Sequence, residues 1–90
     1  MQLTTIEGKF RAGTIVRSPE VTPEEVFVFL IRHVSGDWGD LNEHDWKLND
    51  AALKHGGRLI SQYGTNNGRV IWIITEADRS VTTILVPALY

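Results

Sequence analysis

The chain has 90 residues, a net charge of −2, 42% hydrophobic residues and no cysteine. This length suits a single domain, residues 1–90, near the lower limit for burying an adequate core unaided, so a homodimer would be unsurprising. The charge excludes a general attraction to nucleic acid or anionic membranes, and the absence of cysteine excludes disulfides, a thiolate nucleophile and a thiolate metal site.

The N-terminal sequence MQLTTIEGKF lacks the apolar core of a signal peptide. No apolar run approaches the roughly 20 residues that span a bilayer. The missing cysteines fit a reducing compartment. We therefore expect a cytoplasmic protein that does not enter the membrane.

A strand and a helix are predicted first. Residues 9–16, KFRAGTIV, end in β-branched residues and predict a strand with a bulge at Gly13, able to pair with the edge of a sheet. Thr22, Pro23 and Glu25 then form the start signal of a helix: an N-cap, a proline at the first helical position and the acid of a capping box. The helix should cover residues 23–34, end at Gly36, and present an apolar face of Phe27, Leu30, Ile31 and Val34.

A turn-rich loop and a second helical segment follow. Residues 36–40, GDWGD, are too small and polar for a regular element. Asn42 is a cap signal, and the glycines at 56 and 57 are a stop. Asn49 would lie toward the core of one helix; alternatively Asn49 or Asp50 begins a separate short helix, and two short turns are the preferred interpretation.

The C-terminal third predicts three antiparallel strands, residues 58–65, 69–75 and 81–86. Asn67-Gly68 favours a two-residue type I′ turn, which places Tyr63 opposite Trp72. The same register places Ser61 opposite Ile74, and Ile60 opposite Thr75. The middle strand, VIWIIT, is apolar at every position but the last, so both faces of the sheet should be covered.

The fold class that follows is α+β. It comprises an N-terminal strand, one long and one short helix, and a three-stranded antiparallel meander. Both helices should pack on one sheet face.

Four blocks carry a resemblance to a known family: HVSGDWGD (33–40), DWKLNDAAL (45–53), RLISQY (58–63) and WIITEADRSVTTILVP (72–87). With these blocks the chain resembles a family of small bacterial proteins of unknown function that are often carried by plasmids and other mobile regions. The resemblance covers most of the chain and implies no activity. In layout alone the chain is also similar to small ribonucleases and toxins of the barnase and RelE type, which cleave RNA without a metal.

A ribonuclease needs a base, an acid and a cationic clamp for the phosphorane. The side chains available for those roles are His33 or Glu76 as base, Arg58 or Arg79 as clamp, and Tyr63, Ser61 or Thr82 as phosphate donors. The structural alternative is favoured for this set: a cross-strand packing pair, ordinary strand residues and an exposed hairpin tip.

A binding surface is the favoured interpretation of the two irregular loops. The loop at 76–80, EADRS, carries both charges, and Arg79 is expected to pair with Glu76 or with an aspartate of the GDWGD loop. The two loops would then line one cleft. The candidate binding residues are Asp37, Trp38, Asp40, Glu76, Asp78 and Arg79.

Trp38 is either an exposed interface anchor or, more often for such residues, a cap on the core. A metal site made by His33, Asp37, Asp40, His44 and Asp45 has no recognised ligand spacing, and no metal or other cofactor is expected. Binding to nucleic acid would need a local basic patch, drawn from Lys9, Arg11, Arg17, Arg58 and Arg69. The sequence thus favours a non-enzymatic interaction protein with a protein partner, ahead of a metal-independent ribonuclease or toxin.

Overall fold

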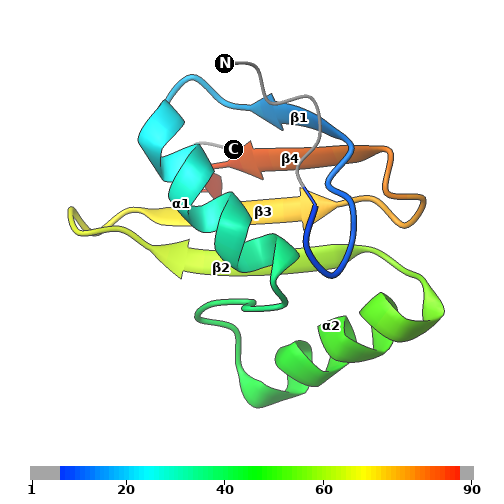
Figure 1. The fold of residues 1–90 in the computed structure, drawn as a ribbon. Coiled ribbons are helices and arrows are strands. Elements are labelled where there is room, and N and C mark those ends of the chain that lie inside the picture. Colours follow the sequence, from blue (N-terminus) through cyan, green and yellow to red (C-terminus); the bar gives the residue numbers. More distant parts are fainter. Residues whose placement is uncertain (1–6, 88–90) are drawn as a thin grey trace.

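The computed structural model describes residues 7–87 as an α+β fold of two helices and one mixed four-stranded sheet (Figure 1). The elements in chain order are β1 (Thr14–Arg17), α1 (Pro23–Val34), α2 (Glu43–His55), β2 (Leu59–Gly64), β3 (Val70–Thr75) and β4 (Val81–Leu85). No helix within these residues is long and apolar enough to cross a bilayer.

The sheet has the strand order β1-β4-β3-β2. The predicted meander is present, since β2, β3 and β4 pair antiparallel in sequence. β1 joins the β4 edge in parallel, with Thr14 opposite Val81 and Arg17 opposite Ile84. The first strand is therefore later and shorter than predicted, because residues 8–10 form a bend and Gly13 adopts a positive φ against the carbonyls of Arg79 and Ser80.

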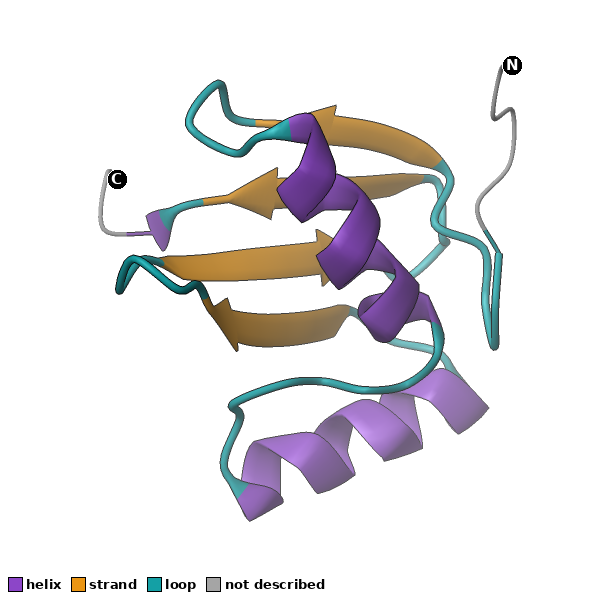
Figure 2. Cartoon of the chain, turned by 60° about the vertical axis from the view of Figure 1, so that its left-hand side comes forward, coloured by secondary structure: helices purple, strands orange, loops and turns teal. Residues whose placement is uncertain are grey.

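Helix α1 crosses one face of the sheet (Figure 2). Its predicted bounds are confirmed: the Thr22 side chain accepts from the Glu25 backbone N–H and the Glu25 carboxylate accepts from the Thr22 N–H, which completes the capping box. The predicted apolar face of α1 differs from the face that is buried by a rotation of part of a turn. Leu30 and Val34 are buried, but Phe27 and Ile31 are exposed, since His33 takes a place on the inward face.

Helix α2 is one continuous helix rather than two short turns, and it is no shorter than α1. It lies beside the β2 edge, not on the face that α1 covers (Figures 1 and 2). Asn49 explains both differences. Its side chain, instead of capping a new helix, donates to the Ile60 carbonyl at 2.5 Å and accepts from the Ile60 N–H at 3.0 Å, so it fastens α2 to the outer edge of β2.

The predicted β2–β3 register is wrong by one residue: Tyr63 lies opposite Ile71, and Gln62 opposite Trp72. The loop has three residues, 66–68, between the Thr65–Arg69 hydrogen-bonded pair, and Gly68 alone adopts a positive φ of 83°. This is the geometry in which an αL glycine follows a type I turn. A one-residue change turns each side chain of the strand to the opposite face.

Only one face of the sheet is covered by the described chain. The core lies between this face and α1, with Leu59, Tyr63, Ile71, Ile73 and Ile84 from the strands. On the opposite face Val16, Val70 and Trp72 remain exposed. The expectation that both faces are covered is therefore not met within residues 7–87.

Candidate functional site

The loop at 36–40 packs against the core and pairs with the edge of β2. Trp38 is fully buried, stacks on Phe10 at 6.2 Å between ring centroids, and donates from Nε1 to the Asp50 carboxylate at 2.9 Å. The backbone of the loop runs along β2: the Gln62 N–H donates to the Trp38 carbonyl, and the Asp40 N–H to the Gln62 carbonyl. The loop thus closes the β2 edge next to Asn49, and Trp38 is a core residue rather than an interface anchor.

Two aspartates of this loop hold neighbouring groups. Asp37 accepts from Arg32 Nε at 2.8 Å, and the guanidinium lies over the Tyr63 ring at 4.6 Å from its centroid. The hydrogen bond from Arg32 lowers the pKa of Asp37, and the Asp37 carboxylate raises the pKa of Arg32. Asp40 accepts from the Gly64 N–H at 3.0 Å. Both carboxylates are therefore satisfied within the chain.

His33 lies in a buried chain of hydrogen bonds that crosses the covered face of the sheet. Thr82 Oγ1 donates to the Ala12 carbonyl at 2.6 Å, so Thr75 must donate to Thr82 at 2.7 Å. His33 Nε2 then donates to Thr75 at 2.9 Å, and Ser61 donates to Nδ1 at 2.5 Å. The chain thus fixes the neutral Nε2–H tautomer.

Burial lowers the pKa of His33 to about 3, and the positive charge of Arg79 contributes in the same direction. Phe10 and Trp38 pack edge-on to the imidazole, with centroids 5.2 and 5.6 Å from it. His33 and Ser61 have no exposed surface. Although these two side chains form a serine–histidine pair, no substrate reaches them in this state, and we assign them a structural role.

The loop at 76–80 is held by Arg79, whose guanidinium donates to the carbonyls of Gly57 (2.5 Å), Glu76 (3.1 Å), Ala77 (3.2 Å) and Ala52 (3.2 Å). Arg79 therefore ties this loop to the end of α2. It pairs with none of the carboxylates that the sequence suggested, since the carboxylate of Glu76 accepts from Arg58 at 3.1 Å instead.

Asp78 is also used inside the loop. Its carboxylate accepts from the Ser80 hydroxyl at 2.5 Å and from the Ser80 N–H at 3.0 Å, and the hydroxyl bond is the main cause that lowers its pKa. This turn leaves the loop a compact hairpin tip.

The two loops do not line a common cleft. The 36–40 loop lies along Gln62 to Gly64, whereas Glu76 follows Thr75, which pairs with Leu59 at the opposite end of β2. The residues proposed for RNA cleavage divide in the same way. Arg58, Glu76 and Arg79 lie together on the surface at one end, while His33 and Tyr63 are buried, and burial raises the pKa of Tyr63.

The described residues form no group of three acidic or histidine side chains at metal-binding separation. The five residues considered as metal ligands instead have separate surroundings. His33 is in the core, for example, whereas Asp37 is paired with Arg32.

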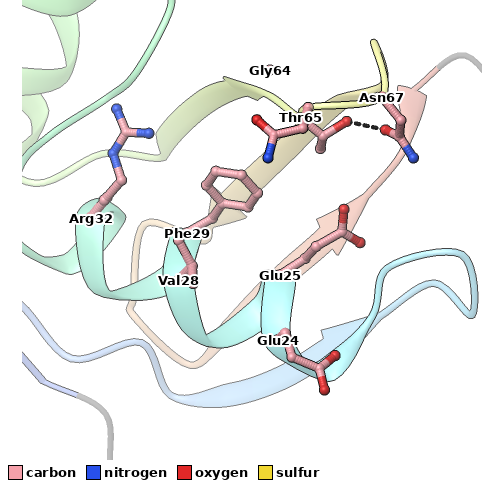
Figure 3. A pocket seen from close by; sticks show the side chains of 9 residues that line it. Glu24, Glu25, Val28, Phe29, Arg32, Gly64, Thr65 and Asn67 are labelled. Carbon is pink, nitrogen blue, oxygen red and sulfur yellow. Dashed lines mark hydrogen bonds between the residues drawn. The ribbon is translucent and has the colours of Figure 1, made fainter.

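A groove lies on the surface between α1 and the β2–β3 loop (Figure 3). It encloses about 520 Å³ and is lined by Glu24, Glu25, Val28, Phe29, Arg32, Gly64, Thr65, Asn66 and Asn67. Figure 3 shows the Phe29 ring between the helix and the loop, with the Arg32 side chain at one end of the groove and Glu24 and Glu25 at the other. The groove therefore has an apolar middle between the guanidinium of Arg32, which is paired with Asp37, and the carboxylates of Glu24 and Glu25, of which Glu25 is paired with Arg69.

Contacts among the residues around the groove hold it in shape and leave the side chain in its middle, Val28, exposed. Phe29 stacks on the buried Tyr63 ring at 4.9 Å, and the Tyr63 hydroxyl donates to the Asp37 carbonyl at 2.5 Å. Glu25 pairs with Arg69, which immediately precedes β3, and its hydrogen bond with the Thr22 backbone is the main cause that lowers its pKa. Val28 remains 54% exposed.

The sequence interpretation missed this groove because its residues were assigned to a helix face and a turn. A signal was present: residues 26–31, VFVFLI, are apolar around the whole circumference of α1. A helix that meets a sheet on one side buries only a stripe, so the remaining apolar side chains mark a surface available to another molecule.

Comparison of the chain with models of protein families, with curated proteins and with solved structures found no match.

Proposed function

We propose that the protein is a non-enzymatic interaction domain whose α1–hairpin groove binds an extended peptide segment of a protein partner. The observation that carries the proposal is the apolar surface made by the exposed Val28 and the half-buried Phe29, between the carboxylate of Glu24 and the guanidinium of Arg32. Such a groove matches the common mode in which an apolar side chain anchors a peptide and charges fix its direction.

The two loops favoured from the sequence support this surface rather than form it. The 36–40 loop supplies Asp37, which fixes Arg32 at the positive end. The 76–80 loop keeps the end of α2 in place through Arg79. The proposal thus retains the class of function and moves the contact surface to α1.

The helix sets the spacing that a ligand should have. Glu24 and Arg32 are eight residues apart, which is about 12 Å along a helix at ~1.5 Å per residue. An extended peptide covers about 13 Å in four residues, and alternate side chains point to the same side. A ligand with lysine, leucine and glutamate at positions i, i+2 and i+4 therefore presents all three side chains to the groove.

The proposal is tested by fluorescence anisotropy with a labelled peptide of this pattern, beside a peptide in which glutamate replaces the lysine. We expect saturable binding of the first peptide and at least about tenfold weaker binding of the second. Val28→Ser should weaken binding by a similar factor. Phe27→Ser is the matched control, because Phe27 is equally exposed at 54% but does not line the groove.

A charge reversal gives a second comparison. Glu24→Lys should reverse the preference between the two peptides, whereas Glu43→Lys, in the first turn of α2, should leave it unchanged. Equal binding of both peptides, or equal losses in Val28→Ser and Phe27→Ser, would show that the groove is not the site.

The ribonuclease alternative has a direct test. Both ring nitrogens of His33 are taken by Ser61 and Thr75 inside the core, so His33 is not hydrogen-bonded to the cluster of Arg58, Glu76 and Arg79. We expect total RNA to stay intact with the purified protein in EDTA. Cleavage that Arg58→Ala abolishes, while the variant stays folded, would establish the enzyme and overturn the binding proposal.

A further inference from the structure

The sheet face opposite α1 has an unusual composition for a surface. Alternation along the strands assigns to it Thr14, Val16, Ile60, Gln62, Gly64, Val70, Trp72, Ile74, Val81, Thr83 and Leu85. None of these positions holds a charged residue, although charged residues make up 22% of the chain. A sheet face that meets water in a monomer alternates with polar and charged side chains, so this composition indicates a covered face.

The polar groups on this face do not oppose burial. Trp72 Nε1 donates to the Gln62 side chain at 3.0 Å across the β2–β3 pair. The two threonines retain hydroxyl groups that rotate toward a partner. A covering surface therefore needs little beyond shape and apolar contact.

We infer that a second copy of this chain covers the face, so that two sheets pack face to face across a two-fold axis. The face carries no charge that would repel its own copy, and like charges are what commonly oppose self-association. β3, VIWIIT, carries apolar side chains on both faces, and the contact would bury both of them, one under α1 and the other under the second sheet.

The area is sufficient for a reversible dimer. Four strands about 4.8 Å apart and about six residues long give a face of roughly 19 by 20 Å. A pocket between α2 and β2 adjoins this face beyond the β2 edge; it is lined by Leu41, Leu48, Asn49 and Ile60, with the charged Asp45 and Arg58 at its border. With side-chain relief, two copies bury on the order of 1,000 Å², the size of a weak, reversible interface.

This contact is independent of the peptide groove. The groove lies between the β2–β3 loop and α1, which covers the other face of the sheet (Figure 2), and it shares with the dimer face only Gly64, which has no side chain. The dimer would therefore leave both grooves open. Failure of one proposal leaves the other standing.

The test is sedimentation equilibrium on the full chain between about 5 and 500 μM. The wild type should form dimers, and Thr83→Lys, which places a charge in the middle of the face, should raise the dissociation constant at least about tenfold. The matched controls are Val16→Lys on this face and Ile31→Lys on α1, because Val16 and Ile31 are 48% and 47% exposed. Val16→Lys should weaken the dimer and Ile31→Lys should not.

A second measurement uses the wild-type chain, so its result does not depend on whether the variants fold. Mixed labelled and unlabelled protein should give intermolecular nuclear Overhauser effects at the Trp72 indole, which is 37% exposed in the single chain. A wild type that is monomeric throughout the range would overturn the inference. So would a dimer that Ile31→Lys disrupts and Thr83→Lys does not, or intermolecular contacts confined to α1.

Discussion

Replacement of Asn49 by alanine tests how the β2 edge is held. Asn49 is 6% exposed, and its side chain joins α2 to β2 through two hydrogen bonds with the backbone of Ile60. Alanine removes two hydrogen bonds worth about 0.5 to 1.5 kcal/mol each and leaves the Ile60 N–H and carbonyl without these partners. We therefore expect a loss of about 2 to 3 kcal/mol in the free energy of unfolding, and a melting temperature lower by about 10 °C or more.

The assay combines chemical denaturation with amide hydrogen exchange. Exchange at the Ile60 amide should accelerate more than exchange in the β3–β4 pair, because the edge opens locally. Asn42→Ala is the control, since it removes the α2 N-cap bond to the Asp45 N–H (2.8 Å) at a cost of about 1 kcal/mol without touching β2. A change below about 0.5 kcal/mol for Asn49→Ala, or unchanged exchange at Ile60, would refute the edge-capping role.

Three further predictions concern the supports of the site. The pKa of His33 is about 3 in the folded chain and near the ordinary 6.5 in the unfolded chain, so as the pH falls the unfolded state takes up the proton first. The wild type should therefore be about 2 kcal/mol less stable at pH 5 than at pH 7 by chemical denaturation. A His33→Gln variant with the same loss of stability between pH 7 and pH 5 would exclude His33 as its source. Gly39→Ala should cost about 2 kcal/mol or more by the same assay, because a Cβ would meet the Gln62 carbonyl and φ is 77°, and a stability equal to wild type would contradict the close approach of loop and strand. Arg79→Lys should cost about 1 to 3 kcal/mol in thermal unfolding, because Arg79 reaches the Ala52 carbonyl of α2 from one guanidinium nitrogen and the Glu76 carbonyl of its loop from another, whereas lysine has a single nitrogen. An unchanged melting temperature would show that the planar guanidinium is not needed.

Signals that depend on neighbouring residues were the ones that could be predicted. The capping box at Thr22 and Glu25 and the glycine at 36 fix both ends of α1 through bonds made within a few residues. The end is a Schellman motif, with the Asp37 N–H donating to the Arg32 carbonyl and the Gly36 N–H to that of His33.

Features that depend on distant partners were predicted less well. The sequence around Asn49 fits both a helix cap and a residue within a helix that bonds to a strand edge. Its bonding partner, Ile60, is eleven residues away, so the neighbouring residues do not distinguish the two. The loop at 36–40 resembles an exposed turn until its backbone is paired with Gln62, which places Trp38 inside.

The buried chain around His33 did have a sequence signal. Ser61, Thr75 and Thr82 are polar positions on three neighbouring strands, at inward positions among apolar residues. In the correct register they lie on one face and require a common partner, but the register was displaced by one residue through the length of the 66–68 loop. An error in one turn therefore concealed a core network as well as the strand pairing.

The binding site is located by following the backbone amide shifts of the labelled protein as the lysine–leucine–glutamate peptide is added. Binding in the groove should cause saturable changes at Val28, Phe29, Arg32 and residues 65–67, with little change at 76–80. Changes confined to the 76–80 loop, or no saturable change at all, would contradict the claim that the α1–hairpin groove is the binding site.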